Sequence, residues 1–273
     1  MITLNGTWQM NCKGEDSWQE GQVPGTVYTD LLRNGQMKDP YVGENEDEVR
    51  DLSYNDYTYR RTFEVEEKTL QNTKNVLVCE GLDTLADVYL NGTHMGSCEN
   101  MHRTYRFDVT ELLKAGTNEI VVELHSPLKY MEEQYEKRPL WGVSSTVPGY
   151  QHIRKAHCMF GWDWGPKLPD LGIWRSIYIE EIQNGRIESV YLRQKLSGNE
   201  ACLTVEVENE IFTEAEGMRV VCIVTAPDGS VAAEKTSEAE KKQSISISIP
   251  NPKFWWPNGY GEQNLYRVSV KLR

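Results

Sequence analysis

The sequence predicts an all-β fold of two consecutive β-sandwich domains, and three observations lead to this prediction. Short runs that alternate apolar and polar residues recur along the chain, for example at 57–65 (YTYRRTFEV) and 118–124 (NEIVVEL). The dipeptide Asn91-Gly92, which is the preferred two-residue hairpin turn, separates two such runs within 86–96. Helical periodicity is confined to two short stretches.

The two short helices are expected in the first domain. One spans 27–32, behind Thr26 as N-cap and before Gly35. The other opens at Ser126-Pro127, with serine as N-cap, proline at the first helical position and apolar residues at i, i+3 and i+7 beyond it. Further strands are expected at 75–79 and 172–180. The helices therefore decorate a β-domain and do not form a layer of their own.

A domain boundary is expected at Asn184-Gly185, so that the first domain covers 1–184 and the second 185–273. About ninety residues follow the boundary, and they contain six short strand-like runs separated by turn residues (ESVYLRQ, CLTVEVEN, MRVVCIVTAP, VAAEKTSE, SISISIP and LYRVSVKL). This spacing of short strands is typical of an immunoglobulin-like sandwich, although the cysteine and tryptophan pattern of antibody domains is missing.

Composition excludes several classes of function. The chain has 273 residues, of which 39% are apolar and 26% charged, as in soluble globular proteins. Its formal charge of −12 disfavours a nucleic-acid partner, and no apolar run approaches the length of a membrane span. The start (MITLNGTWQM) has no features of a signal peptide, and the six cysteines show no metal-ligand spacing. We expect reduced thiols and a cytoplasmic location.

The segment from 137 to 169 has no periodicity and is rich in Gly, Pro, Trp and His. A long irregular stretch of this kind is usually functional when it is not disordered. Its centre, Trp162-Asp163-Trp164, combines two indoles with a carboxylate, the parts that bind a sugar by stacking and hydrogen bonding. The cations Arg154 and Lys155 could pair with Asp163 or hold a sugar hydroxyl. The alternative is that these tryptophans form a corner of the core.

Other chemistry-bearing residues give weaker signals. His152 and His157 lack a third metal ligand at a suitable spacing and are expected to be loop or core residues, so no metal or cofactor is predicted. The acidic run 45–48 (NEDE) is expected to be a solvated surface loop. The segment 255–261 (WWPNGYG) contains Pro-Asn-Gly turn chemistry, and we expect its tryptophans to pack between domains. Spacing alone does not select a pair of catalytic carboxylates from 41 acidic residues.

Several segments, in this order, resemble one family. These segments are LNGTWQM, VPGTVYTDLL, DPYVGENEDEVRDLSYNDYTYRRTFEV, GLDTLADVYLNGTHMG, YRFDVTELLKAGTNEI, IRKAHCMFGWDWGP and FWWPNGYGEQNLY. They are similar to the amino-terminal half of β-mannosidases of glycoside hydrolase family 2, and the similarity covers nearly the whole chain. The GLDTLADVYLNG and DVTELL segments are shared with β-galactosidases and β-glucuronidases, whereas GWDWGP points to the mannosidase branch.

The resemblance implies a jelly-roll, galactose-binding-like domain over 1–184 and an immunoglobulin-like domain over 185–273. In similar enzymes a (β/α)8 barrel follows and carries both catalytic glutamates, so no catalytic residue is assigned to this chain. The resemblance also implies that Trp162, Asp163 and Trp164 reach into the barrel's pocket and bind the terminal mannose of β-mannosides or manno-oligosaccharides. Arg154 and Lys155 match the neighbouring basic pair, in which one residue contacts sugar and the other supports the loop.

Three hypotheses follow. The first is a non-catalytic, amino-terminal portion of a retaining β-mannosidase whose downstream barrel performs the hydrolysis. The second is a stand-alone carbohydrate-binding module that keeps affinity for manno-oligosaccharides through its tryptophans. The third is a structural pair of β-domains without a ligand.

Overall fold

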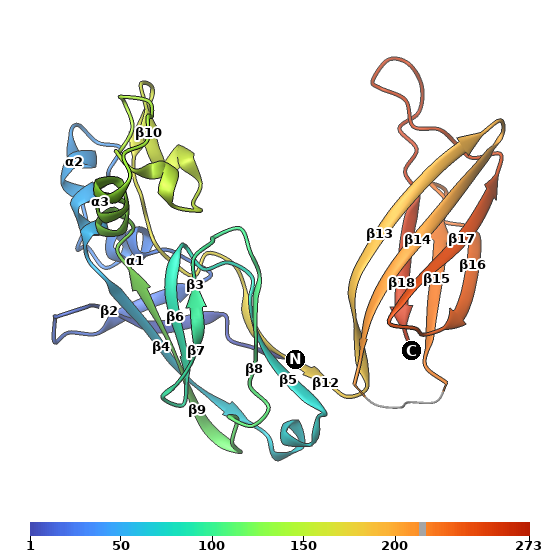
Figure 1. The fold of residues 1–273 in the computed structure, drawn as a ribbon, viewed down its shortest axis with the longest axis horizontal. Helices are drawn as coiled ribbons and strands as arrows, with labels where there is room; N and C mark the ends of the chain where they lie inside the picture. The colour runs from blue at the N-terminus through green and yellow to red at the C-terminus, as the bar shows by residue number, and fades with distance from the viewer. Residues whose placement is uncertain (213–216) are drawn as a thin grey trace. The chain divides into compact units, whose positions relative to one another are not determined.

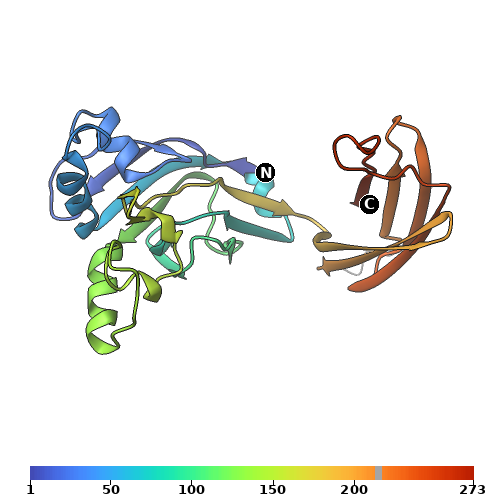
Figure 2. The same ribbon diagram turned by 90° about the horizontal axis from the view of Figure 1, so that it is seen from above.

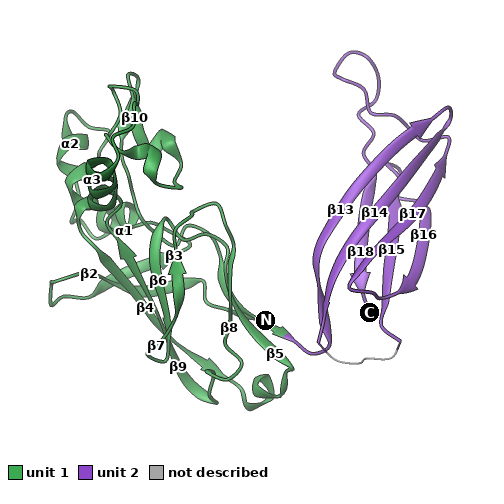
Figure 3. Ribbon diagram, in the orientation of Figure 1, with its two compact units in different colours: residues 1–181 green, residues 182–273 purple. Residues whose placement is uncertain are grey.

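The structure is a computed structural model that describes residues 1–212 and 217–273. The chain divides into two compact units, Met1–Glu181 and Ile182–Arg273, which are coloured separately in Figure 3. Each unit is built from antiparallel strands, which confirms the predicted all-β class. The structural division falls a few residues before the boundary expected at Asn184-Gly185.

Unit 1 is a sandwich of two sheets. The larger sheet has six antiparallel strands in the order β3-β2-β4-β9-β6-β7: Gln19–Val23, Gly6–Cys12, Tyr57–Val65, Gly116–His125, Leu85–Leu90 and Thr93–Cys98. The smaller sheet has the order β1-β12-β5-β8: Ile2–Thr3, Ile177–Ile182, Lys74–Cys79 and Tyr105–Asp108. One core cluster joins both sheets, with Tyr59 and Ile120 from the larger and Leu77 and Ile179 from the smaller.

Most of the predicted local signals of unit 1 are confirmed, although the strand expected at 172–180 begins only at Ile177. Strand β4 has the predicted bounds, 57–65. Asn91 and Gly92 both have positive φ, 50° and 81°, as a hairpin between β6 and β7 with a type I′ turn requires. Helix α1 (Val27–Arg33) is capped by the Thr26 side chain, and helix α3 (Pro127–Lys137) by that of Ser126. The acidic run was wrongly expected to be a loop, because Asn45–Arg50 forms helix α2.

The helices of unit 1 gather at one end of its sandwich, together with strands β10 (Phe160–Trp162) and β11 (Gly165–Lys167), as Figures 1 and 2 show. Four 3₁₀ turns complete the unit: η1 (Asp51–Tyr54), η2 (Glu67–Gln71), η3 (Tyr150–His152) and η4 (His157–Met159). The irregular segment predicted from 137 to 169 is therefore mostly loop, but it contains a short hairpin that the sequence pattern did not reveal.

Unit 2 contains all six strands predicted for the second domain. One sheet has the order β13-β14-β17 (Gly185–Ser197, Glu200–Ile211 and Lys242–Pro250), and the other the order β16-β15-β18 (Val231–Glu238, Arg219–Thr225 and Arg267–Leu272). Their facing residues form a separate core that includes Val205, Val207, Cys222 and Ile247. The six cysteines are free thiols. Among the described residues, the helices are too short or too polar to cross a bilayer.

Candidate functional site

The Trp162-Asp163-Trp164 sequence forms the end of a hairpin in unit 1. Strands β10 and β11 pair Phe160 with Lys167 and Trp162 with Gly165, which leaves Asp163 and Trp164 as the two-residue turn. Gly161 has a positive φ of 92°, and a Cβ at this position would lie 2.4 Å from the Lys167 side chain. The close approach of the two strands therefore requires glycine at 161.

The three residues 162–164, here called the tip, are exposed to solvent. Trp162 is 47% exposed and Trp164 84%, so neither indole is a corner of the core. The Asp163 carboxylate is exposed and makes no hydrogen bond or ion pair within the described parts of the chain. Two open indole faces beside a free carboxylate suit a sugar, whose apolar face stacks on aromatic rings while its hydroxyls donate hydrogen bonds.

An open hollow of about 620 Å³ lies beside the tip. Besides the tip and the β11 strand, it is lined by residues from two other segments of unit 1: Pro40, Tyr41, Gly43, Glu46 and Ser145. The exposed Tyr41 adds a third aromatic ring. Glu46 of helix α2 accepts a hydrogen bond from the Lys167 backbone N–H (3.1 Å), so helix α2 is bonded directly to the hairpin. Sequence reasoning missed Tyr41, Glu46 and Ser145 as neighbours of the tip.

The hairpin rests on helix α3 through a small core of its own. Phe160 and Ile153 pack with Leu128 and Met131 of the helix, and all four side chains are buried. Gly149 lies so close to the helix that a Cβ there would be 2.7 Å from the Met131 carbonyl oxygen, and its φ is +83°. This packing explains how a segment with little regular structure presents a defined tip.

Lys155 precedes Asp163 by eight residues, and its side chain is completely buried. Its ammonium group pairs with Asp83 and donates a second hydrogen bond to the Asp170 carbonyl oxygen (2.6 Å). The Asp170 carboxylate in turn accepts hydrogen bonds from the backbone N–H groups of Tyr28 (3.0 Å) and Leu171 (2.7 Å). We call Asp83, Lys155 and Asp170 the buried base. The expectation that Lys155 could pair with Asp163 is wrong.

Burial governs the ionisation of the buried base. It lowers the pKa of Lys155, against the opposing effect of Asp83. It raises the pKa of Asp170 to about 6, although hydrogen bonds from Thr26 and from the backbone of Tyr28 and Leu171 act in the other direction. The base is thus a desolvated, hydrogen-bonded cluster whose three residues are buried.

The other candidates of this segment are spread around it. Arg154 is exposed, but it does not line the hollow beside the tip. The His152 ring lies 3.0 Å from the Arg138 carbonyl oxygen, and His157 packs edge-on against Tyr150 at 4.9 Å between ring centroids. Both histidines therefore have the loop contacts expected of them. Within 1–212 and 217–273, no group of His, Cys, Asp and Glu side chains could hold a metal ion.

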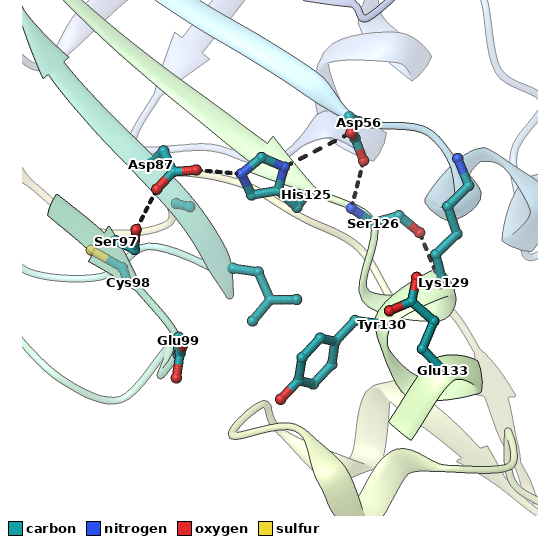
Figure 4. Close-up of a pocket in the computed structure, with 12 residues that line it drawn as sticks. Asp56, Asp87, Ser97, Cys98, Glu99, His125, Ser126, Lys129, Tyr130 and Glu133 are labelled. Carbon is teal, nitrogen blue, oxygen red and sulfur yellow. Dashed lines mark hydrogen bonds and ion pairs between the residues drawn. The ribbon is translucent and has the colours of Figure 1, made fainter. Parts of the chain in front are cut away.

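A second polar hollow, of about 360 Å³, lies between strands β6, β7 and β9 and helix α3 (Figure 4). His125 is placed between two carboxylates, with Nε2 2.8 Å from Asp87 and Nδ1 3.8 Å from Asp56. Burial acts to raise the pKa of Asp87, but hydrogen bonds from Ser97, His125 and His94 outweigh it and lower the pKa to about 2. These contacts join strands β6, β7 and β9, and Asp56 also accepts a hydrogen bond from the backbone N–H of Ser126, the N-cap of helix α3 (2.9 Å).

The aromatic segment 255–261 of unit 2 forms the predicted turn, in which the Tyr260 N–H bonds to the Pro257 carbonyl oxygen at 3.0 Å. Trp255 and Trp256 are each about half exposed. The packing role expected for them stays a prediction.

Comparison with protein families gives two matches along the chain. Residues 8–175 match the family described as glycosyl hydrolase 2 galactose-binding domain-like, and residues 185–273 match the family described as glycosyl hydrolases family 2. These matches agree with a galactose-binding-like domain followed by an immunoglobulin-like one.

Individual relatives carry the names of mannosidases. The chain is 30% identical to beta-mannosidase B of Aspergillus niger, over 99% of this chain and 33% of the relative, and 31% identical to that of Neosartorya fischeri, over 95% and 31%. It therefore spans about a third of the length of the curated relatives that it matches.

Two solved structures match the chain over its whole length. The beta-D-mannosidase of Dictyoglomus thermophilum superimposes with a TM-score of 0.91 and 34% identity, over 100% of this chain and 34% of that one. The Bifidobacterium dentium beta-glucuronidase, at 19% identity and a TM-score of 0.67 over 100% of this chain and 45% of that one, shares the fold.

Proposed function

The chain belongs to glycosyl hydrolase family 2, and from this premise we propose that it is the amino-terminal region of a retaining β-mannosidase. In this proposal the tip completes a pocket for terminal β-linked mannose, and a downstream (β/α)8 barrel supplies the two catalytic carboxylates. The single observation that carries the proposal is the exposed Trp-Asp-Trp tip, which is held on a packed hairpin and whose carboxylate has no partner within 1–212 and 217–273.

The chemistry of the tip supports a binding role. Trp162 and Trp164 offer apolar surface on which a pyranose ring can stack. The Asp163 carboxylate accepts hydrogen bonds only, so it suits a sugar hydroxyl, and a charged acceptor makes stronger hydrogen bonds than a neutral one. Contacts of this kind hold the sugar in a fixed position relative to the catalytic groups and so lower the barrier to reaction.

The two cations of the segment have different roles in this proposal. The Lys155 ammonium is buried and occupied by Asp83 and Asp170, so we assign it the supporting role. Arg154 remains the candidate for substrate contact, because its guanidinium is exposed. This assignment is the part of the proposal that chooses between the two residues.

Hydrolysis is assigned to the barrel. A retaining glycosidase needs a nucleophilic carboxylate and an acid/base carboxyl about 5 to 5.5 Å apart across the glycosidic bond. Of the carboxylates beside the tip, Glu46 is bonded to the Lys167 backbone and acts as a strut for the hairpin. We therefore expect the 273-residue chain to release no aryl group from an aryl β-mannoside, whereas the full-length protein does so. Turnover by the 273 residues alone would defeat the proposal.

A carbohydrate-binding module is the second candidate, and the exposure of both tip indoles in unit 1 itself favours it. Calorimetry of the 273-residue chain with mannose and manno-oligosaccharides separates the two. Sub-millimolar affinity that Trp162→Ala abolishes supports the module, whereas weaker binding supports a pocket that needs the barrel.

We also propose a cytoplasmic location. The six free thiols favour it, because pairing of cysteines is typical of oxidising compartments. Fractionation of the source cells with an antibody against the chain tests the location.

A further inference from the structure

The junction between strand β9 and helix α3 consists of two consecutive residues, His125 and Ser126, with no loop between the two elements. His125 is the last residue of the strand. Ser126 is the N-cap of the helix, and its side chain accepts a hydrogen bond from the Lys129 backbone N–H at 3.1 Å. The direction in which the helix leaves the sheet therefore depends on the contacts that these two residues make.

Asp56, which directly precedes strand β4, contacts both residues of the junction through one carboxylate. Its Oδ1 accepts a hydrogen bond from the Ser126 backbone N–H at 2.9 Å, and its Oδ2 lies 3.8 Å from His125 Nδ1. A hydrogen bond to a carboxylate is stronger than one to a neutral acceptor. Asp56 is itself fixed, because its backbone carbonyl oxygen accepts a hydrogen bond from the Lys13 N–H at 2.8 Å.

Two further contacts bond the junction to the rest of unit 1. His125 Nε2 lies 2.8 Å from Asp87 in strand β6, and the Ser126 hydroxyl donates a hydrogen bond to the Ser53 carbonyl oxygen at 2.7 Å. Figure 4 shows the line of contacts from Asp87 through His125 and Asp56 to Ser126. Because Ser126 is only 3% exposed, loss of a partner leaves a buried polar group unpaired.

Helix α3 connects this junction to the tip hairpin. Leu128 and Met131, in the first part of the helix, are at most 1% exposed and pack with Phe160, the first residue of β10. The Phe160 carbonyl oxygen also accepts a hydrogen bond from the Val147 N–H at 3.0 Å. Trp162 of the tip follows Phe160 by two residues in the same strand. Since close-packed interiors transmit strain, a change in the direction of the helix displaces the hairpin.

From these contacts we propose that Asp56 and His125 are positioning residues for the tip. They fix the direction in which helix α3 leaves strand β9, and the helix in turn holds the hairpin where the tip meets a sugar. Neither residue lines the hollow beside the tip, so both act through helix α3. The inference rests on the proposed sugar-binding role of the tip, and it gives the second polar hollow a part in that role.

His94 offers a matched comparison within the same cluster. Its Nε2 lies 3.1 Å from Asp87, much as that of His125 does. His94 belongs to β7, however, which is the last strand of the larger sheet, and its other described contact is with the ring of Tyr89. Substitution of His94 therefore removes a partner of Asp87 without reaching the start of helix α3.

Hydrogen exchange on the 273-residue chain tests the positioning without any sugar. Asp56→Ala removes the acceptor for the Ser126 N–H, whereas Asp56→Asn keeps an oxygen that can accept and is the conservative control. We expect the Val147 amide to exchange at least about fivefold faster in Asp56→Ala than in the unsubstituted chain, and less than about twofold faster in Asp56→Asn. The amides of Ile120 and Val122, within β9, report general destabilisation. An acceleration at Val147 no larger than theirs would overturn the proposal.

A double-mutant cycle in the full-length protein tests the link to sugar binding. His125→Gln keeps one donor for Asp87 but loses the ring nitrogen that faces Asp56, and it should lower kcat/KM for an aryl β-mannoside about fivefold. His94→Gln should lower it less than about twofold. In an Asp163→Asn background, His125→Gln should change kcat/KM less than about twofold, because both substitutions impair the same contact with sugar.

The cycle and the exchange experiment separate failure of this inference from failure of the proposed function. Equal effects of His125→Gln with and without Asp163→Asn would overturn the inference, because His125 would then act on the fold in general and not on the tip. If Asp163→Asn alone leaves kcat/KM unchanged, the sugar-binding role of the tip fails. The exchange rate of Val147 then still decides whether Asp56 positions the hairpin.

Discussion

The buried base and the exposed tip have opposite chemistry, although the segment 137–169 of unit 1 contributes Lys155 to the base and all three residues of the tip. At the base, Lys155 has no exposed side-chain surface, and its ammonium is bonded to Asp83 and the Asp170 carbonyl. At the tip, eight residues further along, Asp163 has no partner in the described chain and Trp164 is 84% exposed. The base therefore holds the segment in place, and the tip is available for a ligand. The difference teaches that neighbouring charged residues in one motif can have separate tasks.

The largest expected effect is on stability, at the base. Lys155→Met removes one partner of a buried ion pair and leaves the Asp83 carboxylate without compensation, which costs about 3 to 5 kcal/mol. Thermal unfolding of unit 1, followed by circular dichroism, should shift to markedly lower temperature. The matched control is Arg154→Met, an exposed neighbour, which should change stability by less than about 0.5 kcal/mol. Equal effects of the two substitutions would contradict the separation of base and tip.

The next effect is on activity, at the tip. Asp163→Asn in the full-length protein should leave stability unchanged, because the carboxylate is exposed and has no partner to lose among the residues that the structure describes. It should lower kcat/KM for an aryl β-mannoside about 100-fold, equivalent to about 2.7 kcal/mol, because hydrogen bonds to sugar hydroxyls strengthen in the transition state. Steady-state kinetics measure this loss, with Glu48→Gln on helix α2 as the control. If the Asp163→Asn protein instead kept its activity and lost stability, Asp163 would have the structural role that is assigned here to the base.

Sequence reasoning singled out the residues of the tip but not the partners of Lys155 at the base, for a physical reason. The tip is a continuous sequence motif, and its indole and carboxylate side chains indicate stacking and hydrogen bonding directly. The base depends on a contact between Lys155 and Asp83, 72 residues apart, which only the packing of the two sheets creates. The nearest carboxylate along the sequence was therefore the wrong partner to expect.

The same contrast applies to the fold. Strand β4 and the Asn91-Gly92 hairpin were predicted because alternation and turn chemistry are local properties. Helix α2 was missed because it has only six residues and one buried apolar side chain, Val49, which is too little for a visible period. The acidic residues of its first turn interact favourably with the helix dipole. A run of acidic residues is equally typical of a solvated loop, so it did not indicate a helix.

A third expected effect is on the pH dependence of stability, and it contrasts the base with the cluster around Asp87. Burial raises the pKa of Asp170 at the base, whereas hydrogen bonds from Ser97 and the two histidines outweigh burial and lower that of Asp87 to about 2. A carboxyl with a lowered pKa stabilises the fold above its unfolded value, here 3.8, and loses that contribution as the pH falls towards 2.

Denaturant unfolding of the chain and its Asp87→Asn variant at several pH values measures this contribution. The stability advantage of the unsubstituted chain should be full at pH 5, amount to at most about 2 kcal/mol after allowance for partial exposure, and decrease between about pH 4 and pH 2. Asp163→Asn, at an exposed position whose carboxylate has no partner among the described residues, is the control for general acid effects. An advantage that does not depend on pH would show that the Asp87 carboxylate is not held ionised by its partners.

The smallest expected effect concerns the strut between helix α2 and the tip hairpin. Glu46→Leu removes the hydrogen bond that the Lys167 backbone donates, which is equivalent to about 1 kcal/mol. Because the hairpin still packs on helix α3 through Phe160, the tip should become less well positioned without unfolding. We expect KM of the full-length protein for an aryl β-mannoside to rise about fivefold, with kcat changed less than twofold. Glu46→Gln keeps an acceptor oxygen and should restore most of the affinity. The outcome that would contradict this is a melting temperature of unit 1 that Glu46→Leu lowers as much as Lys155→Met does. Glu46 would then stabilise the fold as the base does, and helix α2 and the hairpin would form one rigid body.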